Sequence, residues 1–284
     1  MFISACLYRG YWELKLLYLG ELPKHVWMYW QDMPGVKKPG YIELTLKTAV
    51  LHNQGSFQVH VLNEKNIHEY LPNMRKDLID KLNLPQRADY YRVALLEKYG
   101  GIWLDADTVV MQDLTPLLNL LRYHDFVGFG CNYSADECKK NLNGFPYPCN
   151  WVMLSRAKTK LLAVYKQKQD EILDQHEYAY FQRNYHAIGK EQLIKAIDYV
   201  KQEVPYWSYK HYTSRCVERD SQGVLWNNVR LLSTETIDNK CLSDLIFVPF
   251  YNNSSPKWFR NMSAEQVQKA DYLFSKMIRF ALSK

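Results

Sequence analysis

Two aspartates separated by one residue, Asp105 and Asp107, are the side chains whose type and spacing point most directly to chemistry. They follow the apolar run 102–104, which predicts a short buried strand. Burying an unpaired carboxylate is unfavourable, so two of them at a strand end favour a shared divalent cation or water. Carboxylate oxygens suit Mn²⁺ or Mg²⁺, which often bind substrate phosphates as well. The pair therefore predicts a metal site with Asp105 and Asp107 as ligands, where the ion could bridge a diphosphate and offset its charge.

The helix that precedes this strand carries a second pair of charged residues. Asp89 and Arg92 are three positions apart in the predicted helix 85–99, so they share one face of it. Arg92 could pair with Asp89 or with a phosphate group. Gly100 and Gly101 end the helix and let the chain turn sharply into the strand. A D-x-D triplet alone occurs often by chance, but helix, double glycine, apolar strand and D-x-D in this order favour a ligand site over a solvated turn.

The elements that must position these residues alternate along the chain. Because strands alternate with helices, we expect one α/β domain over residues 1–284. In open α/β sheets, ligands bind beyond the carboxyl ends of strands, which is where the two aspartates fall. Strands are predicted at 24–30, 57–62, 102–104, 108–111, 126–130, 151–155 and 246–250. Helices are predicted at 41–52, 74–82, 85–99, 157–173, 190–203 and 263–282, the last with Ser263 as its N-cap, and a long loop at 131–150.

The composition fits a globular protein and narrows its partners. Hydrophobic residues make up 47% and charged residues 23% of the 284-residue chain, which excludes a wholly disordered or fibrous protein. The net charge of +6 does not argue for nucleic acid at this length, and it is compatible with an anionic small substrate or a membrane surface. Aromatic residues reach 14%, which suits binding of sugars or bases but is equally compatible with an aromatic core.

The N-terminal segment is apolar but does not have the pattern of a leader or a membrane span. Arg9, Glu13 and Lys15 interrupt residues 1–20, and no apolar run approaches the length that a bilayer requires. We therefore expect a cytoplasmic protein without a transmembrane segment, with room for a peripheral membrane contact through this aromatic stretch.

The six cysteines include no C-x-x-C pair. A chain of this size needs no disulfides to fold, so free and mostly buried thiols are expected. A local bridge among Cys131, Cys138 and Cys149 is the alternative.

The motifs resemble those of the D-x-D sugar transferases of glycosyltransferase family 32 and of the capsular polysaccharide synthesis proteins, and the large clostridial glucosylating toxins have a similar core. These proteins share an opening I-P-K-x₅-W and a later [A/S]-D-x₂-R-x₃-L-x₃-G-G-x-Y-x-D-x-D. This chain has LPKHVWMYW at 22–30 and ADYYRVALLEKYGGIWLDAD at 88–107, with Trp103 in place of the usual tyrosine. The clear match covers about 22–130, and a weaker echo runs on to Gly189.

The resemblance implies a GT-A fold in which residues 22–130 bind a nucleotide-sugar donor and residues 131–284 form the acceptor side and a lid. It implies Mn²⁺ or Mg²⁺, retention of the anomeric configuration, and a glycan, lipid-linked or protein acceptor in polysaccharide biosynthesis. UDP is the expected nucleotide, with GDP left open. The resemblance also implies that Trp30 stacks on the base and that the backbone near Tyr29 contacts the base edge. Asp89 would hold the donor sugar, and Arg92 would contact the ribose or phosphate. Asp105 would contact sugar or ribose and help hold the metal, and Asp107 would be the direct metal ligand.

A few further residues have weaker support. Trp103 either lines the site or belongs to the core. Lys257 and Trp258 are assigned to phosphate or sugar by analogy with a late loop that closes over the donor in related enzymes. Trp27 lies three residues before Trp30 on the same strand, so it faces the other way and is expected in the core.

Two other functions remain open. A haloacid-dehalogenase-type phosphatase also has an apolar strand followed by D-x-D-x-[T/V], and there Asp105 would be the nucleophile and Asp107 a general acid. That motif normally follows the first strand, whereas much of the chain precedes it here, and no convincing downstream Lys and G-D-x₃-D motif is present. The other alternative is a non-catalytic nucleotide- or carbohydrate-binding relative.

Overall fold

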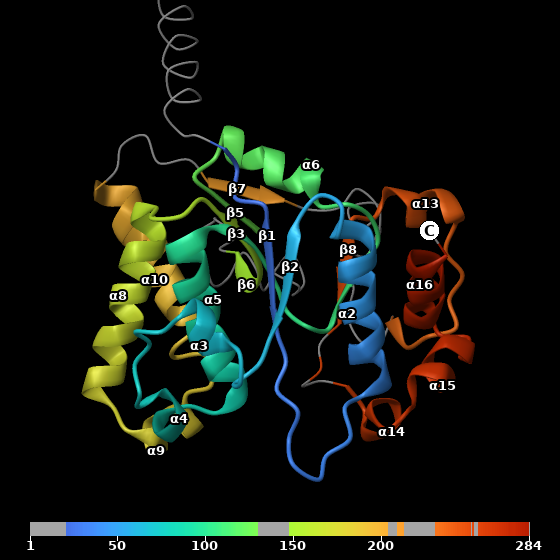
Figure 1. Cartoon of the computed structure of the whole chain (residues 1–284), viewed down its shortest axis with the longest axis horizontal. Coiled ribbons are helices and arrows are strands. Elements are labelled where there is room, and N and C mark those ends of the chain that lie inside the picture. The colour runs from blue at the N-terminus through green and yellow to red at the C-terminus, as the bar shows by residue number, and fades with distance from the viewer. Residues whose placement is uncertain are drawn as a thin grey trace, which may run out of the picture.

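The computed structural model describes residues 21–129, 148–203, 209–212, 231–250, 252 and 255–283, and it has a mixed α/β architecture (Figure 1). A six-stranded sheet forms the centre, and a two-stranded sheet lies beside it. Helices stand on both sides of the central sheet, so that strands such as the one preceding the aspartates are buried along their whole length. The α/β class predicted from the sequence is therefore confirmed.

Three parallel strands make one half of the central sheet and end at a common edge. They are β1 (His25–Tyr29), β2 (Gln58–Leu62) and β3 (Gly101–Leu104), with β1 in the middle. Because the strands run in the same direction, their carboxyl ends bring Trp30, Glu64 and Asp105 toward one edge of the sheet. Helix α2 (Gly40–Asn53) joins β1 to β2, and α3 (Ile67–Tyr70), α4 (Leu78–Lys81) and α5 (Leu84–Tyr99) lie between β2 and β3.

The other half of the central sheet is mixed. β6 (Cys149–Ser155) runs antiparallel to both β3 and β5 (Phe126–Phe129), and β7 (Tyr209–Tyr212) pairs in parallel with β5. The small sheet joins β4 (Thr108–Val110) to β8 (Phe247–Pro249) in antiparallel register. Helix α6 (Thr115–Leu118) and the 3₁₀ turn η1 (Asn119–Arg122) lead from β4 to β5. The two aspartates therefore lie where the chain passes from the main sheet to the small one.

Two helical layers flank the sheet (Figure 1). α5 packs with α8 (Lys160–Gln175) and α10 (Lys190–Glu203) on one side, with α9 (Tyr178–Arg183) near the end of this layer. The other side holds α2, α13 (Asn239–Asp244), α14 (Lys257–Arg260), α15 (Ala264–Lys269) and α16 (Leu273–Leu282). Trp27 is fully buried in the core beneath the first layer, together with Trp103, so the prediction that Trp27 is a core residue is confirmed.

Local signals set both ends of α5, the long helix before β3. Asn83 caps its start: the Asn83 side chain accepts from the Gln86 amide at 3.1 Å, and the Gln86 side chain accepts from the Asn83 amide at 3.3 Å. Gly100 and Gly101 end it with φ values of 69° and 105°, which side chains other than glycine rarely adopt. A Cβ on Gly101 would also lie 2.4 Å from the carbonyl oxygen of His25. The double glycine therefore allows β3 to pair closely with β1.

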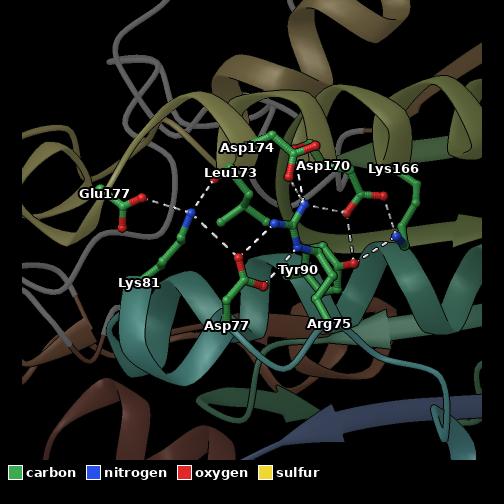
Figure 2. A network of polar contacts seen from close by, with 9 residues as sticks. All are labelled: Arg75, Asp77, Lys81, Tyr90, Lys166, Asp170, Leu173, Asp174 and Glu177. Atoms are coloured by element: carbon green, nitrogen blue, oxygen red, sulfur yellow. Dashed lines mark hydrogen bonds and ion pairs between the residues drawn. The ribbon is translucent and has the colours of Figure 1, made fainter.

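A network of charged residues fastens α5 and the turn before α4 to α8 (Figure 2). Arg75 pairs with Asp77 at 2.7 Å and with Asp174 of α8 at 2.7 Å. On α5, the Tyr90 hydroxyl donates to Asp170 of α8 at 2.9 Å. These contacts hold α5 in a fixed position against α8, and α5 carries the charged pair singled out in the sequence.

Two predicted helices are wrong in extent. The helix predicted at 74–82 begins only at Leu78, because Arg75 and Asp77 pair in a turn before it. The helix predicted at 263–282 is split into α15 and α16, although Ser263 caps its start as expected. At the break, Arg279 donates to the carbonyl oxygens of Gln268 at 2.5 Å and Ala270 at 2.7 Å, which satisfies the last acceptors of α15.

Several other expectations were incomplete, and some concern residues that the structure does not describe. The short elements α3, α6, η1, α9, β7, α13 and α14 were not predicted, and β6 begins at Cys149, inside the expected loop 131–150. Cys241 on α13 is disulfide-bonded, so the expectation of free thiols is wrong for this residue. The N-terminal segment 1–20, the cysteines Cys131 and Cys138, and most of the expected loop lie outside the described residues. Within the part of the chain that is described, no helix is both long and apolar enough to cross a membrane.

Candidate active site

The two aspartates are held in a tight turn at the carboxyl end of β3. The amide of Asp105 donates to the carbonyl of Trp151 on β6 at 2.9 Å, and the amide of Thr108 donates back to the carbonyl of Asp105 at 3.0 Å. From the other direction, the amide of Phe250 donates to the carbonyl of Asp107 at 3.1 Å. Backbone contacts from both sheets therefore fix the D-x-D turn.

Arg92 lies at the centre of an ion network that joins α5 to the turn. Its guanidinium is 3.0 Å from a carboxylate oxygen of Asp89 and 3.0 Å from Oδ1 of Asp105, and its side chain is only 4% exposed. It also donates to the carbonyls of Ala88 and Asn150. The structure thus brings together three of the residues predicted from the sequence, and Arg92 forms ion pairs with two carboxylates at once.

Trp103 supports Asp105 from within the core. Its indole Nε1 donates to Oδ1 of Asp105 at 2.8 Å, and the guanidinium of Arg92 lies over its ring, 5.1 Å from the centroid. The residue is 1% exposed. Of the two roles considered for Trp103, the core role agrees with this burial, while its polar edge orients an aspartate of the site.

Asp89 is enclosed by residues that the sequence only hinted at. The side-chain amide of Asn150 donates to its Oδ1 at 2.8 Å. A Cβ on Gly189 would lie 2.3 Å from its Oδ2, so only glycine leaves room for the carboxylate there. Burial raises the pKa of Asp89 to about 6, and the charge of Arg92 opposes this rise. Asn150 and Gly189 therefore lie directly beside the Asp89 carboxylate. Both belong to the region where the family resemblance is weaker.

Asp107 has no comparable counter-charge. Its Oδ2 accepts a hydrogen bond from the backbone amide of Asn252 at 2.8 Å, and within the described residues no Lys or Arg pairs with it. Burial and then the charge of Asp105 raise the pKa of Asp107 to about 7. Burial also raises the pKa of Asp105, and there Arg92 opposes the rise. Asp107 is therefore the carboxylate whose charge the protein leaves uncompensated.

This donor set fits a divalent cation. Three carboxylates, of Asp89, Asp105 and Asp107, face the single guanidinium of Arg92, which leaves a deficit of positive charge. The contacts of Arg92 and Trp103 reach Oδ1 of Asp105, and the contact of Asn252 reaches Oδ2 of Asp107, so each aspartate presents a second oxygen. Within the described part of the chain, no three His, Cys, Asp or Glu side chains are placed so that they could hold one metal ion together. An ion on these two aspartates would therefore take its other ligands from water or substrate, as Mg²⁺ and Mn²⁺ commonly do.

The exit of β1 holds the two residues predicted to bind the base. Trp30 is partly buried, packs against the core beneath α2, and donates from Nε1 to Asp32 at 2.9 Å. Tyr29 is buried, and its hydroxyl donates to Glu64 at 2.6 Å. Both residues lie at the same strand edge as the D-x-D turn, and Trp30 is only partly buried there.

Glu64 is a member of this edge that sequence reasoning missed. Besides Tyr29, it accepts from the hydroxyl of Tyr91 at 3.1 Å and pairs with Arg87 at 3.1 Å. Its backbone amide donates to the side chain of Gln31 at 3.0 Å, which ties the exits of β1 and β2 together. The sequence contained only an indirect signal for Glu64. Arg87 and Tyr91 are four positions apart on α5, so a single acidic side chain could pair with both of them.

Lys257 and Trp258 were expected in a late loop, but the structure places them at the start of a short helix. Both lie on α14, where Trp258 is 51% exposed and its ring packs 5.5 Å from that of Tyr272. No contact between them and the D-x-D turn is seen in the described residues. A few residues before α14, Asn252 contacts Asp107 through its backbone amide. No local sequence pattern predicted this contact.

The family of the chain follows from its sequence match. The model of the family described as capsular polysaccharide synthesis protein matches residues 18–230, about three quarters of the chain. The chain belongs to this family. The predicted relationship to the capsular polysaccharide synthesis proteins is therefore confirmed, and the prediction of a glycosyltransferase agrees with it. The match includes the whole network of Arg92 and ends before Asn252, Lys257 and Trp258. No curated protein matches the chain.

Solved structures of glycosyltransferases are similar to the chain at low sequence identity. LgtC, a galactosyltransferase in complex with donor and acceptor sugar analogs, is 15% identical over 91% of this chain and 95% of its own, with a TM-score of 0.47. PaToxG glycosyltransferase is 12% identical over 72% and 80%, with a TM-score of 0.39. GlyE from Streptococcus pneumoniae TIGR4 is 16% identical over 68% and 46%, with a TM-score of 0.39.

Proposed function

We propose that this member of the capsular polysaccharide synthesis family is a metal-dependent glycosyltransferase. It moves a sugar from a nucleotide-sugar donor, with UDP as the expected nucleotide, to a glycan, lipid-linked or protein acceptor, with retention. The observation that carries the proposal is the D-x-D turn, where Asp107 keeps an uncompensated charge beside the neutralised pair of Asp105 and Arg92. The family match and the resemblance of residues 22–30 and 88–107 support the same activity.

The donor would lie along the carboxyl edge of the parallel strands. Trp30 would stack on the base, with the backbone near Tyr29 at the base edge. Asp89 would hold the donor sugar, since its carboxylate is kept in place by Asn150 and Arg92. This order agrees with the rule that ligands of open α/β sheets bind beyond the strand ends.

Departure of the nucleoside diphosphate places negative charge on a phosphate oxygen, and stabilising that charge is the main task of the site. Asp105 and Asp107 would hold a divalent cation, which supplies this stabilisation when bound. Arg92 keeps Asp105 and Asp89 oriented and adds positive charge close to the donor. Trp103 holds Asp105 through its indole N–H, so the carboxylate is preorganised before the donor arrives. Lys257 and Trp258 remain proposed donor contacts on the acceptor side.

The experiment is a screen of UDP- and GDP-sugars for hydrolysis by the purified protein, with Mn²⁺, with Mg²⁺ and with EDTA. The proposal expects release of the nucleoside diphosphate from at least one donor, stimulated by Mn²⁺ and abolished by EDTA. p-Nitrophenyl phosphate serves as the control substrate. Its turnover through a phosphorylated Asp105 would instead support the phosphatase alternative, and binding of a nucleotide sugar without turnover, even with acceptors, would support the non-catalytic alternative.

A further inference from the structure

Helix α2 presents a row of buried hydroxyl groups to the D-x-D segment. Tyr41, Thr45 and Thr48 are spaced four and three residues apart, so they lie on one face of the helix. All three are 0% exposed. α2 packs against β4, the strand that begins directly after Asp107. The row therefore faces the segment that carries the proposed metal ligands.

Two members of the row bond the backbone of that segment. The Thr45 hydroxyl donates to the carbonyl of Ala106, the residue between the two aspartates, at 2.6 Å. The amide of Val110 donates to the Thr48 hydroxyl at 3.1 Å. The carbonyl of Ala106 belongs to the peptide group that leads into Asp107, so Thr45 fixes the orientation of the backbone from which that aspartate extends.

The third member reaches Asp107 through one intermediate residue. The Tyr41 hydroxyl donates to the side-chain oxygen of Asn252. The amide of the same Asn252 donates to Oδ2 of Asp107 at 2.8 Å. Burial and the charge of Asp107 raise the pKa of Tyr41, which keeps the hydroxyl protonated as a donor. α2 thus holds both the backbone and, through Asn252, the side chain of this part of the turn.

Packing alone does not explain why buried positions of α2 carry hydroxyl groups. Threonine is a poor helix former compared with leucine or alanine, and a buried hydroxyl is unfavourable unless it is bonded. Thr108, also fully buried and next to Asp107, shows the contrast, because its hydroxyl has no partner among the described residues. Thr45 and Thr108 are therefore a matched pair, in which only the first bonds the D-x-D backbone.

We propose that Tyr41 and Thr45, supported by Thr48, are positioning residues that preorganise the D-x-D turn for a divalent cation. They act through the peptide of Ala106 and through Asn252, and they touch neither metal nor donor. The inference rests on the proposed function, because it concerns how the site of that function is held. Residues that orient metal ligands in this way typically change metal affinity by about 10–100-fold when they are removed.

The test compares Thr45→Val and Tyr41→Phe with Thr45→Ser and with the matched control Thr108→Val. Binding of Mn²⁺ alone is measured from the electron paramagnetic resonance signal of the free ion. Hydrogen exchange of the peptide around residues 103–111 is measured in the metal-free protein. We expect Thr45→Val to weaken Mn²⁺ binding about tenfold or more and to speed exchange in this peptide, with a smaller loss in Tyr41→Phe. Thr45→Ser should restore binding, and Thr108→Val should match the wild type.

Three outcomes would overturn the inference. The first is wild-type Mn²⁺ affinity in both Thr45→Val and Tyr41→Phe. The second is an equal loss in Thr45→Val and Thr108→Val, which would indicate a general packing effect. The third is a wild-type protein that does not bind Mn²⁺ at all. Failure of the proposed function has a different signature, namely Mn²⁺ binding that depends on Thr45 in a protein that turns over no nucleotide sugar.

Discussion

The two carboxylates of the D-x-D turn lie in opposite electrostatic surroundings. Asp105 faces α5, where Arg92 pairs with it at 3.0 Å and Trp103 donates to it at 2.8 Å. Asp107 faces the α2 side, where its partner is the neutral backbone amide of Asn252, at 2.8 Å. The fold therefore neutralises one aspartate internally and leaves the charge of the other for a ligand.

This difference separates stability from activity within one short turn. On the α5 side Arg92 pairs with both Asp89 and Asp105 before any ligand arrives, so removing its guanidinium leaves two buried carboxylates unpaired. On the α2 side the charge is held by neutral groups, so removing it relieves repulsion and takes away a ligand. Substitutions on the two sides should consequently differ in which property they damage first.

The largest effect on turnover is expected from Asp107→Asn. Turnover of the nucleotide sugar should fall roughly 10²–10³-fold. This is the loss typically seen when one group that stabilises charge in the transition state is removed. The melting temperature without metal should be unchanged or higher, because burial and the charge of Asp105 disfavour the ionised form. Donor hydrolysis and thermal unfolding measure the two properties. Asp113→Asn, in the turn after β4, is the control with normal turnover, and wild-type turnover in Asp107→Asn would remove the metal assignment.

On the opposite side of the turn, Arg92→Met should act mainly on stability. It leaves Asp89 and Asp105 buried without their counter-charge, and breaking a buried pair in this way costs about 3–5 kcal/mol of unfolding free energy. Denaturant unfolding measures the loss. The double variant Asp89→Asn with Arg92→Met should regain part of it, because fewer buried charges are left unpaired. A single variant as stable as the wild type would show that the network is not what holds α5 to the turn.

A smaller effect is expected from Trp30→Ala, at the exit of β1. Loss of the indole face should weaken nucleoside diphosphate binding by ~1–3 kcal/mol, the range for a base stacked on an aromatic ring. Calorimetric titration with UDP and GDP in the presence of Mn²⁺ gives the change. Trp258→Ala runs in parallel for comparison, since Trp258 is 51% exposed and lies on α14. An unchanged dissociation constant in Trp30→Ala would leave Trp30 as a packing residue only.

The smallest effect concerns His60 on β2, which belongs to neither side of the turn. Its ring stacks on Trp27 at 4.1 Å and hydrogen-bonds His25 at 3.1 Å, and burial lowers its pKa to about 4. An unfolded histidine has a pKa near 6.5, so the unfolded state takes up its proton first as the pH falls. The contribution of neutral His60 is therefore complete above about pH 6.5 and is lost as the pH falls toward 4.

Between pH 7 and pH 5 this loss should be about 1–2 kcal/mol after allowance for partial exposure. Chemical denaturation of wild type and His60→Gln at both pH values measures it as a difference. Equal pH dependence in the two proteins would contradict the prediction. Metal binding at constant pH should be the same in both, which keeps this effect apart from the turn.

The parallel half of the fold was predictable because its signals are local. Asn83 and Gln86 cap α5, Gly100 and Gly101 end it, and the apolar run 102–104 leads into the aspartates. Hydrophobic periodicity and helix caps are encoded within a few residues, so they can be recognised without knowledge of tertiary contacts. They also placed Asp89 and Arg92 on one face of the helix, which the ion pair at 3.0 Å agrees with.

What could not be predicted depends on contacts between distant parts of the chain. Asn252 is 145 positions from Asp107, and Glu64 is 27 positions from Tyr91. No spacing rule links such residues, because their meeting is set by how the strands and helices pack. The break between α15 and α16 has a similar origin, since Arg279 satisfies carbonyls of the preceding helix from the next one. Sequence patterns alone favoured one continuous helix there.

The most direct test of the account is the binding of UDP and GDP to the wild type and to Asp107→Asn, each with Mn²⁺ and with EDTA, by isothermal titration calorimetry. The account predicts that one nucleoside diphosphate binds the wild type with Mn²⁺, that EDTA abolishes or greatly weakens this binding, and that Asp107→Asn binds equally weakly in both conditions. Binding of equal strength with Mn²⁺ and EDTA in the wild type, or full Mn²⁺-dependent binding in Asp107→Asn, would contradict it.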